Sequence, residues 1–115
     1  MSGDDAVLAG HIQELRRGTV VLAVLATLRT PGYGYALLEE LGAAGIEVDA
    51  NTLYPLLRRL EKQGLLTSMW DTEGERPRKY YQTSDAGVTS MRALAEEWAR
   101  LDTSLSRLLA GEKQR

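Results

Sequence analysis

The sequence predicts a mainly α-helical fold that contains one small β-hairpin. Three observations predict it: apolar residues recur at helical spacing along most of the chain, two short β-prone segments lie close together between residues 65 and 83, and an apolar heptad stripe follows them. The chain has 115 residues, of which 43% are hydrophobic and 26% charged, as is typical of one soluble globular domain.

The first helix is predicted around Leu8, Ile12 and Leu15, whose spacing of four and then three places them on one face. We expect Gly18 to end this helix and Thr19 to cap the next one. The second segment is apolar on nearly every side and rich in β-branched residues, so a strand is the alternative. Its length exceeds the ~4–8 residues of a usual strand, and its Ala and Leu content favours a helix.

A turn and a third helical segment follow. The tract PGYGY (residues 31–35) indicates a turn, and the three leucines behind it share one helical face before Gly42 and Gly45. A further helix is predicted to begin after Asp49 or Asn51, which are both good caps, and to end near Gly64. These short helices, within about 45 residues, form the core of a helix-turn-helix domain.

The helix after Asp49 has one packed face and one free face. Its four leucines fall on one side and its polar residues on the other, with Pro55 among them. Pro55 removes one backbone hydrogen bond, so we expect the helix to begin irregularly at Asn51. A solvated face is the ordinary interpretation of such a pattern, but the helix-turn-helix context favours DNA, because amide, hydroxyl and guanidinium groups bind phosphates and base edges. The candidate contacts on this helix are Asn51, Thr52, Tyr54, Arg58, Arg59 and Lys62.

Residues 65–71 and 78–83 predict two strands joined by a charged loop, that is, a β-hairpin. The formal net charge is −2, yet residues 50–83 contain six basic and four acidic residues. A basic hairpin tip can follow a sugar–phosphate backbone or enter a minor groove. A solubilising loop is the alternative, since Glu73 and Glu75 lie in the same tip. The candidate contacts on the hairpin are Arg76, Arg78 and Lys79.

A long final helix is predicted after Ser84, which can cap it. Its apolar residues step alternately by three and four, and such a heptad stripe needs a partner. We expect a homodimer that joins this stripe to the first helix across a two-fold axis; packing within one chain is the alternative. The predicted dimer contacts are Leu8, Ile12, Leu15, Met91, Leu94, Leu101, Leu105 and Leu108.

Three functional regions are therefore expected. Residues 1–18 form an N-terminal helix for dimer contact, residues 19–83 the DNA-binding domain, and residues 84–115 the C-terminal dimerisation helix. No leader peptide is indicated, because Asp4 and Asp5 stand where a signal peptide needs basic residues, so we expect a cytoplasmic protein.

The residue inventory speaks against catalysis, cofactors and metals. The chain has no cysteine and one histidine, His11. The neighbouring glutamates Glu39–Glu40 and Glu96–Glu97 diverge by about 100° on a helix and cannot converge on one substrate. No glycine-rich phosphate loop precedes a helix. We therefore expect no enzyme, no cofactor and no metal site.

Four strings carry a resemblance to a known family. YGYALLEEL (Tyr33–Leu41), NTLYPLLRRLEKQGLL (Asn51–Leu66), PRKYY (Pro77–Tyr81) and SDAG (Ser84–Gly87) resemble the PadR family of transcriptional regulators in order and spacing. The resemblance, to the small subgroup of that family, covers most of the chain. It implies a winged helix-turn-helix whose third helix enters the major groove of a palindromic operator, with a hairpin wing and a C-terminal dimerisation helix. Tyr33 joins the candidate DNA contacts on this basis.

Trp98 lies in the heptad stripe, and the ordinary interpretation is that it fills the dimer core. The string EEWARLD (Glu96–Asp102) is similar to a multidrug-sensing branch of the family, in which a tryptophan stacks flat aromatic drugs between two subunits. This resemblance implies a repressor that a small molecule releases from its operator. The implied ligand contacts are Trp98, Leu94, Ala95, Ala99 and Asp102. A winged-helix adaptor that binds another protein and no operator is the alternative function.

Overall fold

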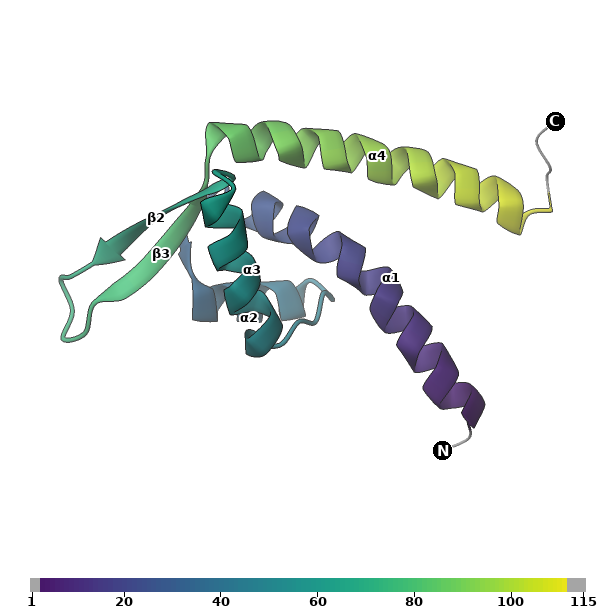
Figure 1. Cartoon of the computed structure of the whole chain (residues 1–115), viewed down its shortest axis with the longest axis horizontal. Helices are drawn as coiled ribbons and strands as arrows, with labels where there is room; N and C mark the ends of the chain where they lie inside the picture. The colour runs from purple at the N-terminus through teal and green to yellow at the C-terminus, as the bar shows by residue number, and fades with distance from the viewer. Residues whose placement is uncertain (1–2, 112–115) are drawn as a thin grey trace.

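The computed structural model describes residues 3–111. In order along the chain, the elements are α1 (Gly3–Thr27), β1 (Gly32–Tyr33), α2 (Gly34–Ala43), α3 (Ala50–Lys62), β2 (Leu66–Asp71), β3 (Arg78–Thr83) and α4 (Asp85–Leu109). Helices α2 and α3 and the inner part of α1 surround the core, and the β2–β3 hairpin projects from it (Figure 1). The N-terminal part of α1 and most of α4 extend away from the core on the side opposite the hairpin and diverge from each other (Figure 1). The fold is thus mainly helical with a small sheet, as predicted.

Helix α1 is a single helix, so the prediction of two helices separated at Gly18 is wrong. It continues through Gly18 to Thr27. Thr19 is no cap; its hydroxyl donates a hydrogen bond back to the carbonyl oxygen of Arg16 at 2.7 Å. An isolated glycine lowers helix stability by only ~1 kcal/mol, and extending a helix already anchored in the core adds one hydrogen bond per residue. The boundary drawn after residue 18 therefore falls inside a continuous helix.

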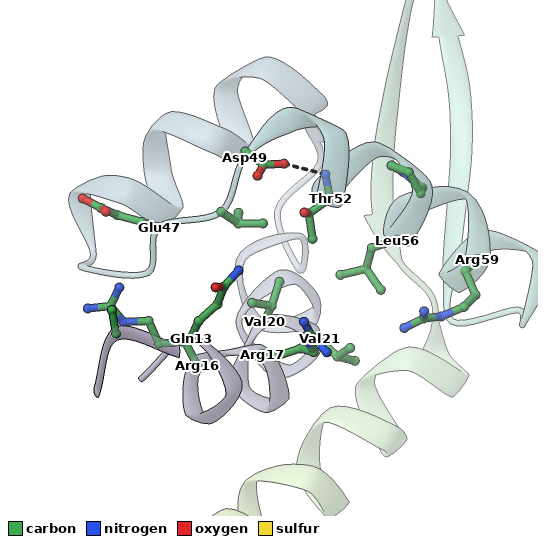
Figure 2. A pocket seen from close by; sticks show the side chains of 13 residues that line it. Gln13, Arg16, Arg17, Val20, Val21, Glu47, Asp49, Thr52, Leu56 and Arg59 are labelled. Carbon is green, nitrogen blue, oxygen red and sulfur yellow. Dashed lines mark hydrogen bonds between the residues drawn. The ribbon is translucent and has the colours of Figure 1, made fainter. Parts of the chain in front are cut away.

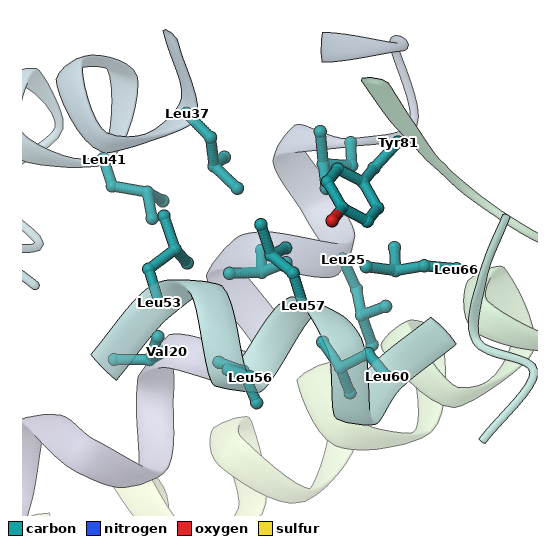
Figure 3. Packing of buried hydrophobic residues seen from close by; sticks show 12 residues of the cluster. Val20, Leu25, Leu37, Leu41, Leu53, Leu56, Leu57, Leu60, Leu66 and Tyr81 are labelled. Carbon is teal, nitrogen blue, oxygen red and sulfur yellow. The ribbon is translucent and has the colours of Figure 1, made fainter. Parts of the chain in front are cut away.

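The core is an apolar cluster between α1, α2, α3 and the hairpin (Figure 3). Figure 3 shows the leucines of α3 pointing toward α1, α2 and Tyr81 of β3. The prediction of one packed α3 face is confirmed, because all four of its leucines are buried. The buried hydrophobic residues of the described part are Val20, Val24, Leu25, Leu28, Leu37, Leu41, Leu53, Leu56, Leu57, Leu60, Leu66 and Tyr81.

Helix α3 begins regularly, one residue earlier than expected. Asp49 is its cap and accepts a hydrogen bond from the backbone N–H of Thr52 at 2.8 Å. Asn51 is therefore already helical. The bond from Leu53 N to Asp49 O at 2.9 Å precedes the one that Pro55 removes, so Pro55 does not delete the first bond of the helix. The expectation of an irregular start at Asn51 is wrong.

The sheet has three strands in the order β1-β3-β2, all antiparallel neighbours. Strands β2 and β3 form the predicted hairpin, with Leu66 opposite Thr83 and Asp71 opposite Arg78. Strand β1 was not predicted; it pairs Gly32 with Tyr81 within the tract that the sequence indicated only as a turn. Two residues are too short to show the alternation by which strands are recognised.

Helix α4 starts at a close junction with the hairpin. The Ser84 hydroxyl accepts a hydrogen bond from Gly87 N at 3.0 Å and donates one to Gly64 O at 2.6 Å, which confirms Ser84 as the cap. A Cβ on Gly87 would lie 2.1 Å from the carbonyl oxygen of Leu65, so only glycine fits there. Within residues 3–111, no helix is long and apolar enough to cross a membrane.

Candidate nucleic-acid interface

The outer face of α3 is polar, cationic and open. Arg58 and Lys62 are exposed on the side opposite the buried leucines, together with Asn51 and Pro55. Among the described residues, neither Arg58 nor Lys62 has an ion-pair partner. Their charge is therefore available to an external anion. This is the face that the sequence predicted to be free.

Tyr54 occupies the edge of this face and is partly buried. Its ring lies against the start of α2, because a Cβ on Gly34 would come within 2.5 Å of Tyr54 Cε1. Gly34 thus allows α2 and α3 to approach each other closely. Tyr54 serves this packing, and only part of its phenol ring remains accessible to a ligand.

The opposite edge of α3 borders a groove of about 950 Å³ between α3 and α1 (Figure 2). Thr52 and Arg59 line it from α3, and Arg16 and Arg17 from α1. Figure 2 shows the Arg59 side chain directed from α3 toward α1. Val20, Val21, Val48 and Leu56 contribute apolar surface, and Glu47 and Asp49 acidic groups.

The groove brings Arg16 and Arg17 close to α3, and sequence reasoning missed this proximity. In the sequence they lie in an amphipathic segment whose surroundings are acidic, and nothing there indicates that α1 crosses beside α3. Arg17 lies 3.6 Å from Glu14 in an exposed pair, whereas Arg16 has no ion-pair partner among the described residues. The groove thus has a cationic edge on the side of α3 away from the hairpin.

Lys79 of the hairpin is engaged with α3. Its ammonium lies 3.0 Å from Glu61 Oε1 and 5.2 Å from the centroid of the Tyr81 ring. The Ser68 hydroxyl donates a hydrogen bond to the other oxygen of the same carboxylate. Ser68 and then Lys79 hold the pKa of Glu61 below its ordinary value, and Glu61 raises the pKa of Lys79. Lys79 therefore connects the hairpin to α3, in contrast to the free cations of α3.

Tyr33 and Arg78 belong to a second cluster, which connects the hairpin to β1 and α2. The Tyr33 hydroxyl donates a 2.6 Å hydrogen bond to Asp71 Oδ2, and Arg78 Nη1 donates one of 3.0 Å to the Tyr35 hydroxyl. The Arg78 guanidinium lies 4.6 Å from the centroid of the Tyr33 ring, which also packs edge-on against Tyr80. The hydrogen bond from Tyr33 lowers the pKa of Asp71, and the pKa of Tyr33 is raised in return.

Arg76 differs from the other two candidate hairpin residues. It is exposed at the tip and has no ion-pair partner among residues 3–111. The sequence grouped Arg76, Arg78 and Lys79 as equivalent cations. In the structure, one of them is free and two are held by neighbouring elements.

Two apolar stripes remain uncovered within one chain. On α1, Leu8 and Leu15 are 58% and 73% exposed, and Ile12 is 37% exposed. On α4, Leu94, Leu101, Leu105 and Leu108 are all exposed, and only Met91 packs against the core. Packing within one chain therefore does not cover the heptad stripe, so that alternative is wrong.

Trp98 shares the exposed stripe of α4, with 54% of its surface accessible. Its proposed neighbours Leu94, Ala95, Ala99 and Asp102 are exposed as well. In a single chain these residues make an open surface, and a pocket around the indole would need walls from a second molecule.

Comparisons with known proteins agree with this architecture. The family model described as the transcriptional regulator PadR-like family matches residues 21–93. The chain is 37% identical over 93 residues to the transcriptional regulator Rv3488 of Mycobacterium tuberculosis, an alignment that covers 77% of this chain and 87% of that protein.

Solved structures give the same result. A PadR family transcriptional regulator from Eggerthella lenta has 50% sequence identity and a TM-score of 0.88, with 91% of this chain and 94% of that chain covered. A PadR-like regulator from Bacillus cereus has 27% identity and a TM-score of 0.76, with 86% and 99% covered. The chain belongs to the PadR-like family of transcriptional regulators.

Proposed function

We propose that this regulator binds double-stranded DNA sequence-specifically as a homodimer, with α3 in the major groove and the β2–β3 hairpin as a wing. The observation that supports this most strongly is the open face of α3, where Arg58 and Lys62 stand exposed and without ion-pair partners among the described residues. A major groove admits one α-helix and offers acceptor atoms to such side chains. The protein acts where the DNA is, in the cytoplasm.

The residues divide by the chemistry they offer. Arg58 and Lys62 reach base edges or phosphates from the centre of the α3 face, and Asn51 and Thr52 contact bases or backbone at its start. Arg76 contacts a phosphate from the wing tip. Arg59 faces the groove beside α1, so its contact is with the backbone that flanks α3.

The uncovered stripes of α1 and α4 support the dimer. Their leucines expose apolar surface, and its burial is favourable at ~25 cal/mol per Å². A two-fold axis between these helices places two copies of α3 on successive major grooves, about 34–36 Å apart. The operator is consequently an inverted repeat.

The dimer also supplies the missing walls around Trp98. A flat aromatic molecule stacks on the two indoles between the α4 helices, beside the small side chains of Ala95 and Ala99, with Asp102 nearby for a cationic group. Ligand binding then changes the separation of the two α3 helices and releases the operator. In this proposal the protein is a repressor.

Selection of duplexes from a random-sequence pool tests the DNA-binding function without knowledge of the operator. The expected result is enrichment of an inverted repeat, bound with an affinity that falls steeply with salt because several phosphates are contacted. A pool that shows no enriched sequence at low salt contradicts the proposal and favours a protein-binding adaptor.

The ligand site has a separate test in the absence of DNA. In Trp70→Phe protein, Trp98 is the only remaining tryptophan, since the chain has two. Titration with planar cationic dyes should quench its emission, and Trp98→Ala should abolish dye binding. Dye binding that survives Trp98→Ala contradicts this site and leaves Trp98 as a residue of the dimer core.

A further inference from the structure

The wing exposes two large apolar side chains that the dimer contacts do not account for. Met69 and Trp70 are each 62% exposed. They lie on β2. The hairpin projects on the opposite side of the core from the N-terminal part of α1 and most of α4 (Figure 1), the parts of these helices that carry the exposed leucines. Among the described residues, the Trp70 indole N–H makes no hydrogen bond. Dimerisation through α1 and α4 therefore leaves Trp70 uncovered.

The strand register places Trp70 on the side of the hairpin that faces α3. Trp70 pairs with Lys79, and Ser68 lies two residues earlier on the same strand. Side chains two residues apart, and those directly opposite across a strand pair, share one face of a sheet. Ser68 and Lys79 both contact Glu61 of α3. The indole therefore lies on this face, two residues nearer the wing tip than Ser68.

Met69 lies on the other face of the same hairpin. It pairs with Tyr80, whose hydroxyl is 3.6 Å from the methionine sulfur and whose ring packs against Tyr33. Two neighbouring residues thus have equal exposure and point to opposite sides. This arrangement separates the effect of the face from the effect of exposed apolar surface.

The face that bears Trp70 continues into the cationic surface of α3. Arg58 and Lys62 are exposed on α3, and Arg76 is exposed at the wing tip beyond Trp70. A duplex that occupies the angle between α3 and the wing would meet the indole between these cations. An indole combines a flat apolar surface, suited to deoxyribose, with one N–H donor, suited to a phosphate oxygen.

We propose that Trp70 is a DNA-contacting residue of the wing, which packs its ring on the sugar–phosphate backbone and donates its N–H to a phosphate. This inference rests on the proposed DNA-binding function. The proposed contact is made by an uncharged side chain, unlike those of Arg58, Lys62 and Arg76. An uncharged side chain releases no counterion, so Trp70 adds affinity without changing the dependence of binding on salt.

The test compares three variants on the duplex that the wild-type protein selects from a random pool. Trp70→Ala should weaken binding roughly 5–20-fold, within the range seen for aromatic contacts to nucleic acids, with the same salt slope as the wild type. Trp70→Phe should retain part of the affinity, because it keeps the ring and loses the N–H. Met69→Ala, the matched control on the opposite face, should bind within about twofold of the wild type. Thermal unfolding checks that all three variants are folded.

Emission from Trp70 supplies an independent readout. In Trp98→Phe protein, Trp70 is the only tryptophan, and a saturating duplex should shift its emission to the blue and reduce quenching by acrylamide. Anisotropy of a dye-labelled duplex reports complex formation in the same sample. Wild-type affinity in Trp70→Ala, or an affinity loss in Met69→Ala equal to that in Trp70→Ala, overturns the inference while DNA binding stands. Failure of the wild-type protein to bind any duplex overturns the proposed function as well.

Discussion

Replacing Lys79 with alanine distinguishes a DNA contact from a contact within the protein. Lys79 pairs with Glu61 at 3.0 Å, and the two side chains are 30% and 33% exposed. A pair this accessible to water contributes ~0.2–1 kcal/mol, so Lys79→Ala should lower the free energy of unfolding by about that amount. Because Glu61 already neutralises the ammonium, the substitution removes no free cation from the surface that we propose faces DNA.

The salt dependence of DNA binding measures this difference. For Lys79→Ala, the slope of log K against log salt concentration should stay close to that of the wild type. Arg76→Ala is the matched control on the same hairpin, and it should reduce the slope by about 0.9, the value for one phosphate contact. The measurement is duplex anisotropy across about 50–200 mM salt. A loss of slope in Lys79→Ala equal to that in Arg76→Ala would refute the assignment of Lys79 to the ion pair with Glu61.

The same ion pair gives the stability a pH dependence. Ser68 and Lys79 lower the pKa of Glu61 in the folded state. A lowered pKa stabilises the fold above the unfolded-state pKa, and this contribution is lost as the pH falls through the folded-state pKa. The stability difference between wild type and Lys79→Ala should therefore shrink below about pH 4.3, the ordinary pKa of glutamate. Urea unfolding at a series of pH values checks this, and a constant difference would contradict it.

Four further substitutions test the fold and the dimer. Leu57→Ala should lower the free energy of unfolding by about 2–5 kcal/mol in urea, because Leu57 is fully buried; a smaller loss would contradict the core described above. Gly87→Ala should lower the free energy of unfolding by about 1–3 kcal/mol, because the added Cβ would clash with the carbonyl oxygen of Leu65. Gly18→Ala is the control: Gly18 has open space around it, so this substitution should be neutral or stabilising by up to ~1 kcal/mol. Equal effects of the two substitutions in thermal unfolding would argue against the close contact between Gly87 and Leu65. Leu105→Asp places a charge in the exposed stripe of α4 and should give a monomer in sedimentation while the core stays folded, and an unchanged dimer would remove that stripe from the interface.

The sequence was sufficient for elements with strong local periodicity. The leucines of α3 repeat at helical spacing and are buried as expected, and strand β3 has the predicted bounds of residues 78–83. The prediction that Gly18 ends a helix was wrong, because α1 continues through it. The local pattern does not show that the residues before Gly18 extend a helix whose later part is anchored in the core.

The state of the candidate site residues depended on contacts between distant parts of the chain. Tyr33 donates a hydrogen bond to Asp71, which is 38 residues away in the sequence, and Lys79 donates one to Glu61, which is 18 residues away. Periodicity within one element contains no information on such partners, so all hairpin cations looked equally free. Assigning Trp70 to one face of the hairpin requires the strand register, and the sequence alone does not give that register.

Arg58 provides the most direct test of the central claim, that the open face of α3 binds DNA. Affinity for the selected duplex is measured by anisotropy for wild type, Arg58→Ala and Arg92→Ala, the last an exposed arginine of α4 that serves as the control. Arg58→Ala should bind roughly 5–150-fold more weakly, the range for loss of one good base contact, with an unchanged unfolding midpoint. Arg92→Ala should bind like the wild type. Wild-type affinity in Arg58→Ala, or an equal loss in both variants, would contradict the account.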